Sequence, residues 1–357
     1  MLDLTDRTHC FYWQTDRILS GEEYVRIFLK RHEESSDMME KILLNGIKTV
    51  KSITSLEIIP PDENVLKGNV NIVRKVILNG KPYIVRMHPR GVKNGYFYAE
   101  KCALHACKLK GIPVPRILEI YEAKNEDDMD FMLCSLTPGI NMDIYLRDHA
   151  DAEQQLLVCA GKQMATIHSI RVEGFGFFNN QIAKEKNELV GIHKNYHDFI
   201  WSGLEENLDR LVGFNILTTL QADKIKQIFI TMNFEPIGRP CLVHNDMADW
   251  NLLTDGTELT GVLDWDECHA GDPIADLACW STFYSIERLE QFLKGYMMIQ
   301  TLPKDYDKRF HYYRLRYTIS KMALRCKRYQ VDKADFILQK IEIGKQALIE
   351  ESAWFHL

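Results

Sequence analysis

Two short segments in the second half of the chain place polar side chains where apolar strands are expected to end. In the first, residues 242–253, an apolar pair leads into a run that contains Asp246 and, five positions later, Asn251. In the second, residues 261–273, another apolar pair leads into Asp264. Polar groups at the ends of adjacent strands converge in mixed folds, and binding sites form there. The two segments therefore predict one site that contains all three side chains.

The residue types at this site fit phosphoryl transfer. That reaction needs a carboxylate that accepts a proton from the acceptor hydroxyl or orients it, and oxygen ligands for a Mg²⁺ ion that bridges nucleotide phosphates. We assign Asp246 as the base and Asn251 and Asp264 as the metal ligands. One carboxylate beside a neutral amide suits Mg²⁺, which keeps several waters.

The full pattern resembles the aminoglycoside phosphotransferase and choline kinase family. It comprises His244-x-Asp246-x4-Asn251, then Leu263-Asp264-Trp265-Asp266, then Gly271-Asp272-Pro273-x2-Asp276-Leu277-Ala278. The ordered combination is far more specific than any of its pieces. The resemblance implies an α+β, protein-kinase-like fold with two lobes. The alternative is a buried polar network that merely ties two strands together.

Other polar residues of the pattern have expected supporting roles. His244 is grouped with the catalytic residues, where we expect it to orient the Asp246 loop rather than to transfer a proton. Asp266 is either a third neighbour of the metal or a structural acceptor. Asp272 and Asp276 are expected to hold loops by accepting backbone N–H bonds.

Composition limits the class of protein. With 357 residues the chain is too long for one compact core, which favours two lobes. The net charge of −6 and the pI near 6.1 argue against nucleic acid as the main partner. No apolar run suggests a membrane span or a signal peptide, and nine cysteines without a paired motif are typical of reduced thiols. We therefore expect a cytoplasmic protein with no membrane partner.

The pattern along the chain predicts four regions. Residues 1–50 form a helical N-terminal extension, with helix starts at residues 20–23 and 37–40. The resemblance implies the other three: residues 51–134 form a nucleotide-binding lobe with a small mixed sheet, residues 135–140 a hinge, and residues 141–357 a larger, mostly helical lobe. Within the small lobe, Asn79-Gly80 is a strong hairpin signal.

The resemblance assigns nucleotide-binding residues in the small lobe. Arg86 stands where the family commonly has a lysine that contacts the phosphates, and Glu100, on a helix expected over residues 94–110, is its expected ion-pair partner. Arginine keeps the charge but is not a neutral replacement. Gly68 and Asn71 resemble the loop that covers the phosphates.

The expected hinge would bind the base of the nucleotide. We expect the Ser135 carbonyl and the Thr137 amide to bond the edge of the base. The resemblance implies a nucleoside triphosphate, ATP or GTP, as the phosphate donor.

The acceptor, a small molecule with a hydroxyl group, is the open part of the assignment. A polycationic aminoglycoside would need an acidic pocket, and a choline-like alcohol would need aromatic faces. The acidic candidates are Asp249, Glu267, Glu205, Glu206 and Asp209; the aromatic candidates are Trp201, Trp250, Trp265, Trp280 and Tyr284. Resemblance favours aminoglycosides. The rivals are a catalytically inactive nucleotide-binding interaction protein, which the Arg86 departure motivates, and a protein kinase.

Two further features have structural interpretations. His168 lies on an apolar helical spacing and is expected to be a satisfied core histidine. The basic stretch over residues 304–328 is expected to be a solvated helix face.

Overall fold

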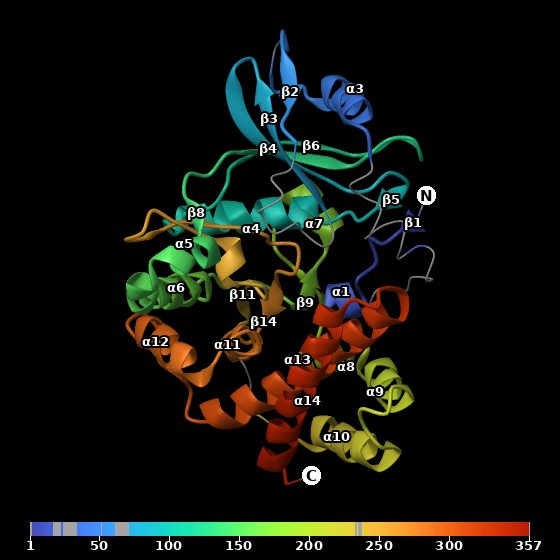
Figure 1. Ribbon diagram of the computed structural model, residues 1–357, viewed down its shortest axis with the longest axis vertical. Helices are drawn as coiled ribbons and strands as arrows, with labels where there is room; N and C mark the ends of the chain where they lie inside the picture. Colours follow the sequence, from blue (N-terminus) through green and yellow to red (C-terminus); the bar gives the residue numbers. More distant parts are fainter. Residues whose placement is uncertain are drawn as a thin grey trace.

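The computed structural model describes residues 2–16, 23, 34–50, 52–60, 71–232, 234 and 238–356. A five-stranded sheet with helix α3 occupies one end of the molecule, and the helices α9, α10 and α14 occupy the other (Figure 1). Residues 20–22 of the expected helix start at 20–23, and Gly68, lie outside the described residues.

The five-stranded sheet has the order β2-β3-β4-β7-β6, and every pair of neighbours in it is antiparallel. Its strands are β2 (Leu56–Ile58), β3 (Ile72–Leu78), β4 (Lys81–Met87), β6 (Ile117–Tyr121) and β7 (Phe131–Ser135). The expected hairpin at Asn79-Gly80 joins β3 to β4. Both turn residues have positive φ, 49° and 76°, as a tight two-residue turn requires.

One face of this sheet packs against α3 (Ser36–Gly46). Ser35 caps the helix by accepting the amide of Met38, and Met39, Ile42 and Leu43 form its buried side. These residues and the apolar side of β3 and β4 make a hydrophobic core of their own, separate from the larger core around the helices. The sheet that carries Arg86 is therefore a distinctly packed unit.

The remaining elements form the larger core. The helices there are α4 (Phe97–Leu109), α5 (Met142–Asp148), α6 (Glu153–Ile167), α7 (Asn180–Lys186), α8 (Tyr196–Trp201), α9 (Leu204–Gly213), α10 (Thr219–Thr231), α11 (Pro273–Ser281), α12 (Ile286–Tyr296), α13 (Tyr306–Val331) and α14 (Asp335–Trp354), with short 3₁₀ turns η3 (Ala150–Ala152) and η4 (Asp249–Asn251). Helix α13 packs against α9, α11 and α14.

Two small sheets within this part carry the site. One has the order β10-β9-β14-β11 and the other the order β13-β12-β8. Their strands are β8 (Ile140–Asn141), β9 (Phe175–Phe178), β10 (Gly191–His193), β11 (Cys241–Val243), β12 (Leu252–Thr254), β13 (Leu259–Val262) and β14 (His269–Gly271). The strands that precede Asp246 and Asp264, β11 and β13, thus belong to different sheets.

The N-terminal segment connects both parts of the molecule. Strand β1 (Leu2–Asp3) pairs in parallel with β5 (Val92–Lys93), and the short helix α1 (Trp13–Asp16) packs on α13. The aromatic run at residues 11–13 is buried. The Asp16 carboxylate accepts the amides of Phe11 and Tyr12 and the side chain of Asn207. Residues 2–16 of the extension are therefore part of the folded core.

The basic stretch at residues 304–328 departs from its expectation. It forms most of α13, but Arg309, Arg316 and Lys321 are at most 4% exposed, so the prediction of a solvated face was wrong. The Arg316 guanidinium donates to the carbonyls of Ile200 and Ser202, at 2.8 and 2.6 Å. Because these two carbonyls lie more than a hundred positions away in the sequence, the local charge pattern could not predict that Arg316 is buried.

Candidate active site

Arg86 on β4 joins the sheet to the helical part through two carboxylates. One guanidinium nitrogen pairs with Glu100 on α4, and the other donates to Asp264 Oδ1 at 3.0 Å. The Glu100 side chain is 1% exposed and that of Arg86 12%. The expected Arg86–Glu100 ion pair is present, and the contact with Asp264 adds a link that the sequence did not suggest.

The pKa values of Arg86, Glu100 and Asp264 reflect both burial and neighbouring charges. Burial raises the pKa of Glu100 to about 7, although the Arg86 guanidinium opposes the rise. Burial alone would lower the pKa of Arg86, but the Glu100 and Asp264 carboxylates raise it above its usual value. Desolvation and the neighbouring Asp266 raise the pKa of Asp264 to about 6, against the effect of Arg86. Arg86 therefore remains a cation at the cleft.

The β12–β13 hairpin brings Asn251 and Asp264 together. Leu252 pairs with Val262 across the hairpin, and the Leu263 amide donates to the Asn251 carbonyl at 2.8 Å. The two candidate ligands thus flank one end of the hairpin. Asp264 has a φ of 62°, which aspartate tolerates better than most residues and which redirects the chain beyond β13.

Asp246 lies beside Asn251. The Asn251 Nδ2 donates to the Asp246 carbonyl at 2.8 Å and to its Oδ2 at 3.0 Å. Asp246 is 9% exposed, and burial together with the Asp264 carboxylate raises its pKa well above the usual value. The three residues that the sequence pattern singled out are therefore brought to one place, although through a hairpin and a side-chain bond rather than through adjacent strands of one sheet.

His244 holds the loop between β11 and Asp246. Its Nδ1 accepts the Asp246 amide at 3.2 Å and its Nε2 donates to the Leu263 carbonyl at 3.0 Å. Both ring nitrogens are used, the residue is fully buried, and burial lowers its pKa. These contacts favour the orienting role and link the Asp246 segment to the Asp264 segment.

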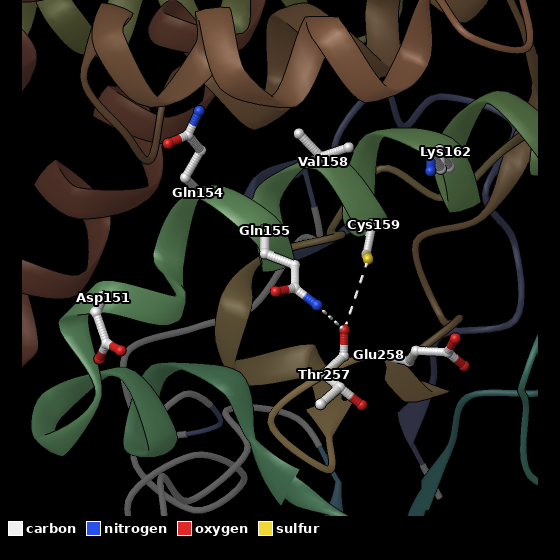
Figure 2. Close-up of a pocket in the computed structure, with 8 residues that line it drawn as sticks. All are labelled: Asp151, Gln154, Gln155, Val158, Cys159, Lys162, Thr257 and Glu258. Atoms are coloured by element: carbon white, nitrogen blue, oxygen red, sulfur yellow. Dashed lines mark hydrogen bonds between the residues drawn. The ribbon is translucent and has the colours of Figure 1, made fainter.

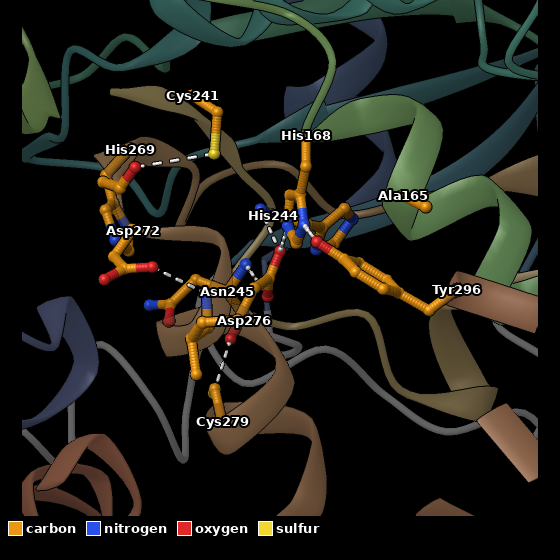
Figure 3. Close-up of polar contacts among 12 residues, drawn as sticks. Ala165, His168, Cys241, His244, Asn245, His269, Asp272, Asp276, Cys279 and Tyr296 are labelled. Carbon is orange, nitrogen blue, oxygen red and sulfur yellow. Dashed lines mark hydrogen bonds and ion pairs between the residues drawn. The ribbon is translucent and has the colours of Figure 1, made fainter. Parts of the chain in front are cut away.

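Asp276 on α11 accepts two backbone amides of the same loop, from His244 at 2.8 Å and from Asn245 at 2.9 Å (Figure 3). His168 Nε2 lies 3.1 Å from the same carboxylate, and its Nδ1 lies 2.9 Å from the Tyr296 hydroxyl. His168 is thus a satisfied core residue, as expected. Asn245 has a φ of 69°, so the loop turns sharply where Asp276 holds it.

Asp272 begins α11 as its N-cap. It accepts the Ile274 amide at 2.9 Å, and Pro273 occupies the first turn, where its missing N–H costs nothing. Its other oxygen accepts from Arg309 at 2.8 Å and from Tyr313 at 2.9 Å. The expected loop-holding roles of Asp272 and Asp276 are confirmed, and both act through α11.

The donor set around Asp264 fits a magnesium ion. Asn251 uses its Nδ2 for Asp246, and its Oδ1 accepts no bond from the described residues. Asp264 uses Oδ1 for Arg86 and keeps 38% of its side chain exposed. No cluster of three or more His, Cys, Asp or Glu able to hold a metal occurs within the described ranges. An amide and one carboxylate suit Mg²⁺, which takes its remaining oxygens from phosphates and water.

The expected base-binding residues lie at the end of β7 and just after it: Ser135 is its last residue, and Thr137 follows two positions later. Ser135 exchanges backbone and side-chain bonds with Arg116, so its position is set by β6 and the segment before it. Its neighbour Leu136 is 40% exposed, and Thr137 packs near Gly261 of the β12–β13 hairpin. Of the expected phosphate-covering residues, Asn71 directly precedes β3 and is 5% exposed. Their nucleotide roles remain predictions.

The acidic residues expected to bind the acceptor do not form one pocket. Asp249 pairs with Arg288 at 2.6 Å, and Glu267 is fully buried and accepts the Trp13 amide at 3.1 Å. Glu205 on α9 pairs with Lys226 on α10, and Asp209 is exposed on α9. Sequence spacing could not show these cationic and amide partners.

The aromatic candidates are also separated. Trp265 and Trp280 are 1% exposed core residues, and Trp201 stacks on His197 of the same helix. Trp250 and Tyr284 are half-buried and both contact Phe283. This last pair lies close to the catalytic loop, because Trp250 directly precedes Asn251, and the buried Trp265 ring also packs against His244, with 4.4 Å between the ring centres.

A hollow of about 570 Å³ lies between α6 and the turn that joins β12 to β13 (Figure 2). The Thr257 carbonyl at its edge accepts from Gln155 at 2.8 Å. None of the residues that line the hollow belongs to the Asp246 cluster. The hollow is therefore a surface feature beside the hairpin and not the catalytic centre.

The α+β fold and a site built on Asp246 define a kinase-like phosphotransferase. The chain belongs to the phosphotransferase enzyme family whose model is abbreviated APH, which matches residues 64–309. A hygromycin-B 4-O-kinase from Escherichia coli is 21% identical over 257 residues, which cover 71% of this chain and 69% of that protein. The expected family and enzyme class are thereby confirmed.

Solved structures support the same fold. An aminoglycoside phosphotransferase structure matches with a TM-score of 0.60 at 16% identity, covering 88% of this chain and 99% of that one. A related ternary complex with AMP-PNP and hygromycin B matches with a TM-score of 0.59 at 18% identity, covering 86% of this chain and 98% of that one. A putative fructosamine-3-kinase from Haemophilus somnus matches with a TM-score of 0.54 at 17% identity, covering 83% and 92%. None of the described helices is long and apolar enough to span a membrane.

Proposed function

We propose that this enzyme transfers the terminal phosphoryl group of a nucleoside triphosphate to a hydroxyl of a small molecule. The observation that carries the proposal is the convergence of Asp246, Asn251 and Asp264 with the Arg86–Glu100 pair. The complex of a structural relative with AMP-PNP supports a nucleotide donor. The membership of this chain in the phosphotransferase family supports an alcohol as acceptor.

Each residue has a part in the proposed reaction. The acceptor oxygen attacks the γ-phosphorus, the bond to the β–γ bridging oxygen breaks, and the nucleoside diphosphate leaves with that electron pair. Asp246 orients the hydroxyl and takes its proton. Arg86, placed by Glu100, contacts the phosphates, while the Ser135 carbonyl and the Thr137 amide bond the base.

Mg²⁺ bound by Asn251 and Asp264 would neutralise charge on the β- and γ-phosphates. Arg86 also donates to Asp264 Oδ1 at 3.0 Å, so a cation holds this carboxylate in position. His244 and Asp276 hold the loop in this arrangement. Catalysis then consists mainly of positioning and electrostatic stabilisation.

The acceptors of the relatives define the first candidates. Hygromycin B is named for the curated relative and for a solved complex, which makes aminoglycosides the first class to assay. A fructosamine-type sugar derivative is a second candidate, because putative fructosamine-3-kinases share the fold.

The test is transfer of labelled γ-phosphate from ATP or GTP onto a panel of hygromycin B, choline, neutral sugars and a generic protein, with and without Mg²⁺. We expect Mg²⁺-dependent labelling of a small hydroxyl compound. Labelling of the protein alone would identify a protein kinase, and tight nucleotide binding without transfer to any acceptor would identify a nucleotide-binding protein that is not an enzyme.

A further inference from the structure

The Asp264 carboxylate lies on a segment that has no regular secondary structure. Strand β13 ends at Val262 and β14 begins at His269, so residues 263–268 form the connection between them. Asp264 has a φ of 62°, and residues 265–268 after it are buried. Because no strand or helix fixes this connection, the direction of the Asp264 carboxylate depends on the groups that hold the connection from outside.

The N-terminal residues 2–16 supply two of these outside contacts. Nη1 of the Arg7 guanidinium donates to the Asp266 carbonyl at 2.5 Å, and the Trp13 amide donates to the Glu267 carboxylate at 3.1 Å. The partners of these two bonds are 259 and 254 positions apart in the sequence. The N-terminal segment therefore holds two consecutive residues of the connection.

Arg7 is a buried cation enclosed by aromatic rings. The residue is 3% exposed, and its guanidinium carbon lies 3.7 Å from the centre of the Tyr96 ring, 4.2 Å from that of Trp13 and 5.0 Å from that of Phe177. Contacts with aromatic faces stabilise a cation that has left water. A charged donor also makes a stronger hydrogen bond to the Asp266 carbonyl than a neutral donor would. The enclosure thus keeps this bond in one place.

The other end of the Arg7 guanidinium reaches the start of α4. Its Nη2 donates to Asn94 Oδ1 at 3.3 Å, and Asn94 lies three residues before the first residue of α4. Just before Asn94, strand β5 pairs with β1, so the N-terminal segment contacts this part of the chain twice. Helix α4 carries Glu100, the ion-pair partner of Arg86. Arg7 therefore connects the helix that places Arg86 with the segment that carries the candidate metal ligand.

Tyr96 holds the far end of the same connection. Its hydroxyl donates to the Cys268 carbonyl at 2.6 Å and accepts the Phe178 amide at 3.0 Å. Its ring is also the one that lies nearest to the Arg7 guanidinium. One side chain therefore both encloses the cation and anchors the connection at its last residue.

The residues at positions 2–16 lie outside the region that this chain shares with its family. The family model matches residues 64–309, so Arg7 and Trp13 are not among the matched positions. The family match therefore assigns them no role. What they do follows from the contacts that they make in this chain.

We propose that Arg7 is a positioning residue of the phosphoryl-transfer site. By fixing the Asp266 carbonyl it keeps the Asp264 carboxylate in the orientation that binds Mg²⁺, and through Asn94 it joins that carboxylate to α4. Arg7 is buried and acts through the connection, not through contact with a substrate. The inference rests on the proposed kinase function and deepens it, because it names a residue on which Mg²⁺-dependent nucleotide binding depends.

The test is calorimetry of nucleotide binding at a series of Mg²⁺ concentrations, with AMP-PNP or GMP-PNP according to the donor that the enzyme uses. Arg7→Met keeps the length of the side chain and removes its charge and its donors. We expect the Mg²⁺ concentration for half-maximal nucleotide binding to rise about tenfold, which corresponds to about 1.4 kcal/mol, close to one hydrogen bond from a charged group. We also expect kcat to fall about tenfold and KM for the acceptor to change by less than about twofold, since Arg7 does not touch the acceptor.

Two conservative variants decide the question if Arg7→Met does not fold. Arg7→Lys keeps a cation among the rings and one donor, and we expect the Mg²⁺ requirement to rise about threefold. Tyr96→Phe keeps the ring and removes the bond to Cys268, with an expected rise of about threefold as well.

Leu4→Ala is the matched control for a loss of stability. Leu4 is a buried apolar residue of the same segment, and its amide donates to the Lys93 carbonyl at 2.7 Å. We expect Leu4→Ala to lower the midpoint of urea unfolding and to leave the Mg²⁺ requirement unchanged. A residue that only stabilised the fold would behave like Leu4.

Two results would overturn the inference. One is a wild-type Mg²⁺ requirement in every folded variant at positions 7 and 96. The other is a rise in Leu4→Ala as large as that in the Arg7 variants, because loss of stability alone would then explain the effect. If the wild-type protein binds nucleotide with Mg²⁺ in either case, the proposed kinase function stands; a wild-type protein without such binding would overturn both.

Discussion

Removing either side chain of the Arg86–Glu100 pair should lower the free energy of unfolding, but by different amounts. Arg86→Ala leaves the Glu100 carboxylate, 1% exposed, without its cation. Removing one partner of a buried pair costs about 3–5 kcal/mol, and we expect a loss of that size in the free energy of unfolding. Glu100→Ala leaves Arg86 paired with Asp264, 38% of whose side chain is exposed, so its cost should be smaller, about 1–3 kcal/mol.

The assay is a double-mutant cycle on unfolding in urea at pH 8, above the Glu100 pKa of about 7. Coupled neighbours have interaction energies of about 0.5–3 kcal/mol, and we expect a value in the upper half of that range. Nucleotide affinity, measured on the same four proteins, should fall strongly in Arg86→Ala and less in Glu100→Ala. Simple additivity in both stability and nucleotide affinity would refute the pair.

The same pair gives a pH signature. Because burial raises the folded-state pKa of Glu100 from 4.5 to about 7, the folded protein binds a proton in that window that the unfolded chain does not. The Glu100 contribution to stability is therefore full below pH 4.5 and is lost as the pH rises through 7. Glu100→Gln should reduce the pH dependence of stability in this window, where Asp264 also titrates; an unchanged slope would mean that Glu100 does not contribute to it.

Two further substitutions test the metal site and the loop. Asp264→Asn should raise the Mg²⁺ concentration needed for half-maximal activity, because it removes the charged ligand; an unchanged Mg²⁺ requirement would exclude Asp264 from the metal site. Asp276→Ala removes the acceptor of two backbone amides and of His168, and we expect a loss of about 2–4 kcal/mol in stability together with a fall in kcat. Asp276→Asn, which keeps one acceptor oxygen, should lose less; equal losses would show that the hydrogen bonds do not matter.

Local signals in the sequence predicted much of the framework. The Asn79-Gly80 turn gave the β3–β4 register, and the glycine at position 111, with a φ of 76°, follows the C-terminus of α4 as expected. Helix α4 begins at Phe97, three residues later than predicted. These features depend on a few neighbouring residues, so spacing and residue type are sufficient to find them.

The polar motif predicted the members of the site but not how they meet. Asp246 and Asp264 follow strands of different sheets, and the β12–β13 hairpin, with the Asn251 side chain, connects them. The contact between Arg86 and Asp264 spans 178 positions. Periodicity carries no information about contacts of this kind.

Charge partners were the least predictable part. Asp249 and Glu267 could be read as exposed acids because Arg288 and the Trp13 amide are distant in sequence. The same holds for Lys321, which was grouped with a solvated helix face although α11 and the N-terminal segment cover it. The high content of Lys and Arg over residues 304–328 was the available signal, and it does not distinguish a solvated face from a buried one.

The central claim is that Asp246 acts on the acceptor hydroxyl while other residues hold the nucleotide. The most direct measurement is the single-turnover rate of phosphoryl transfer in Asp246→Asn, with nucleotide and acceptor saturating and the nucleotide affinity determined by calorimetry. We expect the rate to fall by about 10²–10⁴-fold, as for the loss of a positioned base, with nucleotide affinity within a few-fold of wild type. A rate close to that of the wild type, or a collapse of nucleotide binding in the folded variant, would contradict the account.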